Sequence, residues 1–192
     1  MIGRTHALAA FTALGAVYFA RSPQTMSLAT ILVGLLANQI GGIAPDIDQP
    51  TAPFWRNLPI GGPIGRVVDR MLGGHRFITH SLIGLVLFGV LVHLLLVFLQ
   101  PIMPIVDISL VWAAFVIGML SHLVMDTFTK EGVPWLLPLP IKFGIPPLRS
   151  LRITSGKNIE NFIIVPGLIA ANVILYATHY SELLLRIHQH IT

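Results

Sequence analysis

His122 and Asp126 are the two residues of this 192-residue chain whose types and spacing most directly suggest chemistry. They are four residues apart, so on a helix they share one face and lie one turn from each other. An imidazole and a carboxylate held in this way can bind a divalent cation from a single rigid element. The same spacing also occurs in pairs that only hydrogen-bond to each other, so the pair alone leaves both interpretations open.

The composition limits the kind of protein that can hold such a pair. Hydrophobic residues make up 54% of the chain and charged residues only 10%, and the mean hydropathy is +0.79. Soluble domains carry about 25% charged residues, so the sequence predicts an integral membrane protein. Because the chain has no cysteine, any transition-metal site must use His, Asp and Glu, which suits zinc, manganese or iron.

Five apolar segments predict an all-α fold, a polytopic membrane helix bundle of about five spans in a single domain of residues 1–192. Their ends are marked by proline, glycine and charged residues, and the expected helices cover about residues 5–20, 28–43, 79–99, 108–127 and 159–176. The first run is short for a full span, so we expect it to be tilted or packed among the others. Residues 51–74 should form an interfacial loop with one short helix near 64–72, and residues 129–158 a long loop.

The ionisable residues gather at one membrane face when these helices alternate in direction. The residues concerned are His6, Asp46, Asp48, His75, His80, His122, Asp126 and Glu160. Scattered structural residues have no reason to collect in this way, whereas a shared cation explains why so many ionisable groups are tolerated near lipid. The pattern therefore predicts a metal site of one or two ions.

Several of these residues also have structural interpretations that the sequence leaves open. The alternatives are an interfacial or N-cap role for His6, an Asx turn for Asp46 and Asp48, and a helix-dipole partner for Glu160. His75 and His80 share a helix face poorly, so one could bind the metal while the other orients a partner or the substrate. Thr79 could be a helix cap, and we expect His93, in the middle of an apolar span, to be a packed core histidine.

Basic residues are distributed unevenly between the two sides of the expected bundle. The side with the N-terminus and the 46–80 and 128–160 segments carries ten of the twelve Lys and Arg residues, and the other side has Arg21 and Arg186. This bias predicts that the N-terminus and the ionisable face are cytoplasmic, in the inner or cell membrane. Arginines that bind a phosphate substrate would raise the same count.

Three ordered motifs carry a resemblance to a known family. Pro45–Asp48, His75–Ser81 and Ser121–Thr129 resemble the YdjM-like family of LexA-regulated, membrane-bound, predicted metal-dependent hydrolases. The later segments Gly132–Leu139 and Ser155–Glu160 are also similar, so the resemblance covers most of the chain. That family is remotely similar to zinc-dependent phospholipase C and related single-strand nucleases, helical proteins whose zinc clusters include a His-x3-Asp pair. This chain lacks the further histidine pairs of their three-zinc site, which leaves the number of metals open.

Together the residues and the resemblance imply a membrane-bound hydrolase of a phosphoester, either a lipid phosphate or a phosphodiester. The expected ligands are His122, Asp126, Asp46 and a histidine of the 75–80 segment, around one or two divalent ions, most simply zinc. Asp48 would bridge a second metal or act as general base, Arg76 would clamp the phosphate, and Thr79 completes the expected catalytic residues.

Two other classes remain open from the sequence. A transporter or proton relay would use intramembrane His and Asp, but it would spread them across the bilayer depth instead of bunching them at one face. A non-catalytic metal-binding membrane protein would have the same ligands. The expected partners are the lipid bilayer and an anionic phosphate-containing substrate, with no nucleic acid; the sequence does not indicate an oligomeric state.

Overall fold

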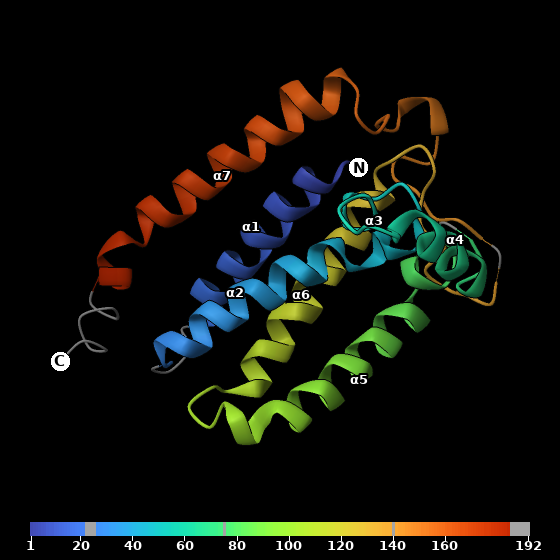
Figure 1. Ribbon diagram of the computed structural model, residues 1–192. Helices are drawn as coiled ribbons and strands as arrows, with labels where there is room; N and C mark the ends of the chain where they lie inside the picture. Colours follow the sequence, from blue (N-terminus) through green and yellow to red (C-terminus); the bar gives the residue numbers. More distant parts are fainter. Residues whose placement is uncertain (22–25, 75, 140, 185–192) are drawn as a thin grey trace.

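The computed structural model describes residues 1–21, 26–74, 76–139 and 141–184, and the regular elements in this part of the chain are helices (Figure 1). Within these described residues, four helical segments are long and apolar enough to cross a membrane, namely Leu28–Asp48, Leu82–Ile102, Ile108–Thr127 and Glu160–Thr178. They confirm the predicted all-α polytopic bundle, with four such spans where about five were expected.

The bundle is built from five long helices. These are α1 (Gly3–Arg21), α2 (Leu28–Ile43), α5 (Leu82–Leu99), α6 (Ile108–Thr127) and α7 (Val165–Thr178), the last preceded by a π-helical turn at Glu160–Ile164. The bounds of α2 and α6 agree with the predicted ones, since the side chains of Ser27 and Asp107 cap their N-termini. α5 begins later than expected because Ser81, and not Thr79, is its N-cap.

α1 is the predicted helix that falls outside the four candidate spans. It forms over the expected residues and packs against α2, α6 and α7, so it lies within the bundle. Arg4, Thr5, His6 and Thr12 make it more polar than the other long helices. A helix surrounded by protein can carry such residues, because their polar groups find partners there and not in lipid.

α2 and α6 make the closest contact in the bundle, and glycine permits it. A Cβ atom added at Gly41 would collide with the carbonyl oxygen of Phe115, and one added at Gly118 would collide with that of Asn38. The Asn38 amide also donates a hydrogen bond of 3.0 Å to the Ala114 carbonyl. Small residues and interhelical hydrogen bonds are typical of helix pairs in membranes.

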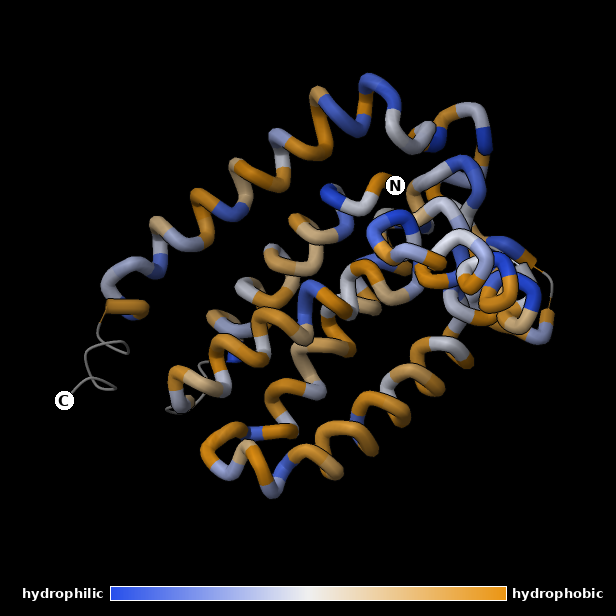
Figure 2. Tube along the Cα trace, viewed as in Figure 1, coloured by the Kyte–Doolittle hydropathy of each residue, from blue (hydrophilic) through white to orange (hydrophobic). Residues whose placement is uncertain are grey.

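α5 stands at the edge of the bundle, and α6 is the long helix that it mainly contacts. Hydrophobic residues cover it along its length (Figure 2). His93 lies on the exposed face of α5, with its ring centroid 6.1 Å from that of Trp112. The prediction of a packed core histidine was wrong, because most of the circumference of an edge helix faces lipid and not protein.

The segment after α2 contains two short helices where one was expected. The 3₁₀ turn Ala44–Asp48 leads into α3 (Pro53–Arg56) and then α4 (Gly61–Met71), which begins before the predicted residue 64. Trp55 fixes this segment to the turn, because its indole donates a hydrogen bond of 2.9 Å to the Ile47 carbonyl.

The described residues between 128 and 159, which leave out residue 140, form a loop that folds back against the end of α6. Its strand-like contacts are two isolated bridges, Thr129 with Ile153 and Val133 with Phe143. The Trp135 indole donates to the Thr127 hydroxyl at 3.0 Å, which holds the loop on the last turn of α6. The loop therefore lies at the same end of the bundle as the 3₁₀ turns Ala44–Asp48 and Ile78–His80.

Candidate metal centre

Seven of the eight predicted metal-site residues lie in the described part of the chain, and the eighth, His75, lies outside it. Six of the seven come from four elements. His6 is in the first turns of α1, Asp46 and Asp48 are in the turn after α2, His80 is in the turn before α5, and His122 and Asp126 are in the last turns of α6. Glu160 begins the segment before α7. The structure brings six of them together and places Glu160 apart from the group.

One group of donor atoms consists of Asp46, His80 and His122. The Nε2 atoms of the two histidines are 3.3 Å apart. Asp46 Oδ1 lies 3.9 Å from His80 Nε2 and 3.6 Å from His122 Nε2. Ligand atoms about 2.0–2.2 Å from a tetrahedral ion are about 3.3–3.6 Å from one another, so these separations fit a single ion.

Asp126 presents its second oxygen to the same two histidines. Its Oδ2 lies 3.6 Å from His80 Nε2 and 3.8 Å from His122 Nε2. The His122–Asp126 pair of α6 therefore meets His80, which comes from the turn before α5. Asp126, His80 and His122 have fully buried side chains, so this part of the site is closed to water.

Both histidines of this group are held through the nitrogen that faces away from the donor atoms. His122 Nδ1 donates to the Gly42 carbonyl at 2.7 Å. His80 Nδ1 lies 2.9 Å from the Thr79 hydroxyl oxygen and 3.4 Å from Asp48 Oδ2. Outer hydrogen bonds of this kind fix the tautomer and orientation of metal-binding histidines and leave the Nε2 lone pair for the ion.

Asp48 is fully buried behind His80. Its Oδ2 accepts a hydrogen bond of 3.0 Å from the backbone N–H of Arg76 and a short one from the Thr79 hydroxyl. With that proton donated to Asp48, the Thr79 oxygen is free to accept from His80 Nδ1. Thr79 and Asp48 therefore support His80, a contact that the sequence alone did not indicate.

The pKa of His80 reflects these neighbours. Burial acts to lower it, but hydrogen bonds to Asp126 and Asp48 and the negative charges of both carboxylates outweigh burial and raise the pKa above its ordinary value. His80 is thus surrounded by the charges that favour a cation.

A second group of donor atoms consists of His6, His122 and Asp126. The His6 and His122 rings are stacked, with centroids 3.5 Å apart and planes inclined by 10°. His6 Nε2 lies 3.3 Å from Asp126 Oδ1, and neither ring nitrogen of the fully buried His6 has a hydrogen-bond partner. A buried polar atom without a partner is costly, and a cation beside Asp126 would satisfy this one. The donor set therefore fits a metal.

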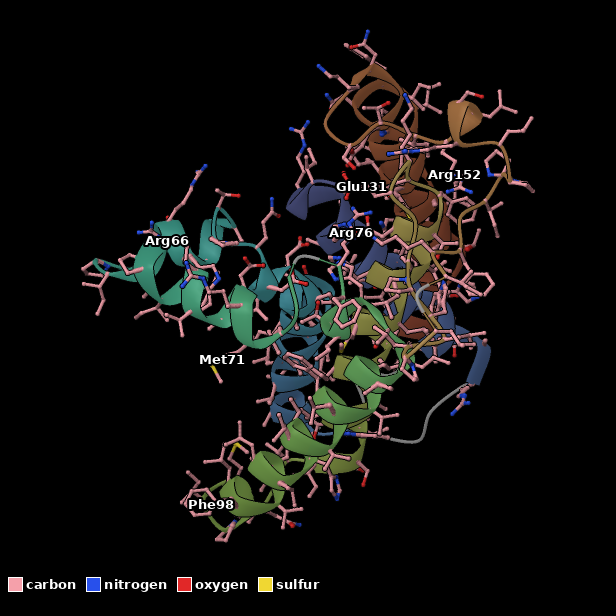
Figure 3. The ribbon with its side chains drawn as sticks, turned by 90° about the vertical axis from the view of Figure 1, so that its right-hand side faces the viewer. Arg66, Met71, Arg76, Phe98, Glu131 and Arg152 are labelled. Carbon is pink, nitrogen blue, oxygen red and sulfur yellow. The ribbon has the colours of Figure 1, made fainter. Side chains whose placement is uncertain are left out.

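Asp126 is also held by cations of the protein itself. Arg76 Nη2 lies 2.6 Å from Asp126 Oδ2, and the amino group of Met1 makes a short contact with Oδ1. The Arg76 guanidinium also donates to the Thr129 hydroxyl at 2.7 Å, and its Nε lies 3.3 Å from Glu131 Oε2. Figure 3 shows Arg76 and Glu131 close to each other at this end of the bundle.

Arg76 reaches these partners from an unusual backbone conformation. Its φ of 60° is in the left-handed region, which residues other than glycine seldom adopt. The expected role as a phosphate clamp stays a prediction, since its guanidinium here contacts Asp126, Thr129 and Glu131. Thr129 and Glu131 were not assigned a role from the sequence, although Thr129 ends the Ser121–Thr129 motif and Glu131 follows it closely.

Glu160 belongs to neither group of donor atoms. Its Oε1 accepts hydrogen bonds from the Ile2 N–H at 2.8 Å and the Thr5 hydroxyl at 2.6 Å, and its Oε2 accepts from the Gly156 N–H at 2.6 Å. These bonds tie the beginning of α1 to the segment before α7. In this arrangement Glu160 accepts hydrogen bonds from the protein, and its expected role as a metal ligand stays a prediction.

Comparison with known proteins identifies several similar sequences. The family model described as YdjM inner membrane protein matches residues 1–183. The uncharacterized protein YvsG of Bacillus subtilis (strain 168) is 26% identical over 186 residues, which are 95% of this chain and 99% of that protein. The inner membrane protein YdjM of Escherichia coli (strain K12) is 34% identical over 122 residues, or 63% of this chain and 56% of that protein. No solved structure matches the chain.

Proposed function

Because the chain belongs to the YdjM inner membrane protein family and is a multi-pass integral membrane protein, we propose that it is a membrane-bound, metal-dependent hydrolase of phosphoesters. The observation that carries the proposal is the meeting of His80 and His122 with Asp46 and Asp126: the two Nε2 atoms are 3.3 Å apart, and each lies 3.6–3.9 Å from one carboxylate oxygen of each aspartate. Ionisable groups at membrane depth are costly and mark functional sites.

The first ion would be held by Asp46, His80 and His122, with Asp126 as a fourth donor. When bound, a divalent ion of this kind supplies an activated water and polarises a phosphoryl oxygen. The imidazole and carboxylate donors and their near-tetrahedral spacing favour zinc, with manganese and iron as the alternatives. Asp126 Oδ2 would join this ion only after the Arg76 guanidinium moves from it, and a second ion beside His6 would have to displace the Met1 amino group from Asp126 Oδ1.

Access to the centre is expected at Asp46. Its side chain is 18% exposed, whereas those of His80, His122 and Asp126 are fully buried. A catalytic metal site keeps one position open for water or substrate. The reacting phosphate would therefore approach beside Asp46, and the buried residues would hold the ion from behind.

We assign Asp48 and Thr79 as positioning residues for His80. They contact the imidazole nitrogen that faces away from the centre, so they act through the ligand and not on the substrate. The roles expected for Asp48 from the sequence, a metal bridge or a general base, would require its carboxylate to turn towards the ion. Turnover of Asp48→Asn at saturating metal separates these roles, because a positioning residue affects metal affinity more than turnover.

The test begins with the metal content of the purified wild-type protein in detergent or nanodiscs. We then expect hydrolysis of phosphomonoester, phosphodiester or lipid-phosphate substrates that stops on addition of a chelator and returns with zinc. Absence of bound metal, or hydrolysis that a chelator leaves unchanged, would contradict the proposal. Bound metal without turnover of any of these substrates would indicate a non-catalytic metal-binding protein instead.

The centre is proposed to face the cytoplasm. Ten of the twelve basic residues belong to the segments expected on the same side as the donor residues. Reporter fusions after Arg21 and after Thr192 should both give the signal of the outer side. A cytoplasmic signal from the fusion after Arg21 would mean that α1 does not cross the membrane.

A further inference from the structure

α4 carries its large apolar residues on the side that faces away from the protein. The preceding N-cap residue Ile60 and Ile64, Val67 and Met71 of α4 follow one another at intervals of three or four residues, which places them in one stripe along this side of the helix. They are 66%, 39%, 56% and 76% exposed, respectively. In a water-soluble protein such a stripe would be turned inwards.

The face of α4 that packs on the protein consists of small residues. A Cβ atom added at Gly61 would collide with the carbonyl oxygen of Trp55, and one added at Gly65 would come within 2.9 Å of the Trp55 ring. The Trp55 indole donates a hydrogen bond to the carbonyl of Ile47, and Ile47 lies between Asp46 and Asp48 in the chain. α4 is therefore attached through Trp55 to the turn that supplies one of the candidate ligands, and its apolar stripe is left outside.

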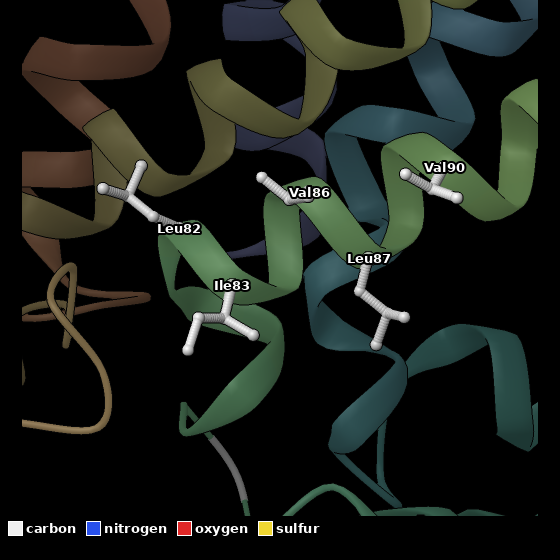
Figure 4. Close-up of a pocket in the computed structure, with 5 residues that line it drawn as sticks. All are labelled: Leu82, Ile83, Val86, Leu87 and Val90. Carbon is white, nitrogen blue, oxygen red and sulfur yellow. The ribbon is translucent and has the colours of Figure 1, made fainter.

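α5 offers a second exposed apolar surface at the same end of the bundle. An open hollow of about 470 Å³ is lined by Leu82, Ile83, Val86, Leu87 and Val90 (Figure 4). It begins at the second residue after His80. From Leu82 to Val90 the helix rises by about 12 Å, close to the roughly 15 Å hydrocarbon depth of one leaflet.

The apolar stripe of α4 and the hollow on α5 border the same space beside the bundle. Figure 3 shows α4 projecting sideways from the end at which α5 begins, with Met71 pointing to the side on which α5 continues towards Phe98 and Arg66 pointing away from it. Arg66 and Arg70 are both exposed on α4. An amphipathic helix of this kind lies in the membrane surface, with its apolar face among acyl chains and its arginines at phosphate depth.

We propose that the α4 stripe and the α5 hollow form a lateral docking surface for the acyl chain of a membrane phospholipid, which presents its phosphate to the metal centre. Two observations identify the occupant as lipid. α5 has the highest hydropathy of the four candidate spans, so its outer face contacts acyl chains. Arg66 and Arg70 on α4 attract anionic head groups. The inference rests on the proposed function and specifies its substrate class as a bilayer lipid.

The activity test compares two substrates with the same head group, a long-chain phospholipid in vesicles and a short-chain, water-soluble analogue. In Met71→Asp, we expect hydrolysis of the vesicle substrate to fall by about tenfold or more, because an aspartate opposes insertion of the stripe. Hydrolysis of the soluble analogue and the metal content should change by less than about twofold. Gly62→Asp is the matched control, since a Cβ atom at Gly62 meets nothing within 4 Å and the position lies on the opposite face of α4.

Equal losses on both substrates in Met71→Asp, or no loss on either, would overturn the docking surface. If the wild-type protein hydrolyses neither substrate, the proposed function fails, and a second measurement still decides the placement of α4. Since the chain has no cysteine, single nitroxide labels at Met71→Cys and Gly62→Cys report depth without background labelling. We expect the first label to be accessible to oxygen in the bilayer and the second to an aqueous nickel chelate. A water-exposed label at position 71 would overturn the inference.

Discussion

The two groups of donor atoms share His122 but differ in how well the protein prepares them for an ion. In the group of Asp46, His80 and His122, both imidazoles have a partner on the nitrogen that faces away from the centre. In the group of His6, His122 and Asp126, the His6 ring has no hydrogen bond on either nitrogen, and the Asp126 oxygen that faces His6, Oδ1, is in contact with the Met1 amino group. The two groups therefore have similar residues at similar distances, but the protein fixes the side-chain orientations of the first group more fully than those of the second.

The difference shows that donor atoms can be close together without being held in the orientation that an ion needs. Donor atoms become a strong site when surrounding groups hold them in the geometry that the ion needs. We therefore expect the first group to bind an ion tightly. The second group should bind more weakly, or should support the first through the His6–His122 stack and the Arg76–Asp126 pair.

The largest effect is expected from His122→Ala, because this change removes the one ligand that both groups share. The metal content measured by elemental analysis should fall to about one-tenth of the wild-type value or less, since each group then keeps only one imidazole. His93→Ala is the control, because His93 lies on the exposed face of α5. Metal content equal to wild type in His122→Ala would remove the basis for both groups.

His80→Ala and His6→Ala are expected to differ in how much they weaken metal affinity. We expect the loss of His80 to weaken metal affinity by about 100-fold or more, and the loss of His6 to weaken it by about tenfold or less. Competition with a chromogenic chelator measures both affinities. The reverse order would show that the His6 group is the primary site and that the outer hydrogen bonds of His80 and His122 do not decide affinity.

A smaller effect is expected from Asp48→Asn, which keeps the shape of the side chain but removes its charge behind His80. Metal affinity should fall by about tenfold, as for other outer partners of metal-binding histidines, while turnover at saturating metal should largely persist. Thr79→Ser keeps the hydroxyl group and serves as the control. Loss of turnover with unchanged affinity would instead identify Asp48 as a general base or a metal bridge.

The smallest effect on the metal is expected from Glu160→Gln. Glu160 accepts three hydrogen bonds that join α1 to the segment before α7, and it belongs to neither group. The change should leave metal content unaltered and lower the unfolding free energy by about 1–2 kcal/mol, seen as a lower thermal midpoint. Metal loss without a change in the midpoint would restore Glu160 as a ligand.

The sequence predicted the helices and the clustering, because both follow from local information. Apolar runs and the residues that end them located α2 and α6, and alternating helix directions brought Asp46, His80 and His122 to one end. The loop helices were harder to predict. α3 and α4 depend on the contact between Trp55 and Ile47, which hydrophobic periodicity does not report.

The orientation of each site residue could not be read from the sequence, because it depends on partners distant in the chain. The Gly42 carbonyl reaches His122 only because Gly41 and Gly118 let α2 and α6 approach closely. The direction of the Arg76 guanidinium depends on a left-handed backbone conformation that an arginine seldom adopts. His93 was predicted to be buried because it lies in the middle of a span. It faces outwards because α5 packs against the bundle along one side only, which the sequence of α5 alone does not reveal.

The position of His122 in both groups also sets an order of events during synthesis. The residues that precede it reach the membrane while neither group is complete, because each lacks the imidazole that α6 supplies. No ion can be captured by either full group until α6 has been inserted beside α2. For the proposed centre, metal loading would therefore follow the insertion of α6 into a bundle whose earlier helices are in place, and the ion would enter on the side where Asp46 is partly exposed.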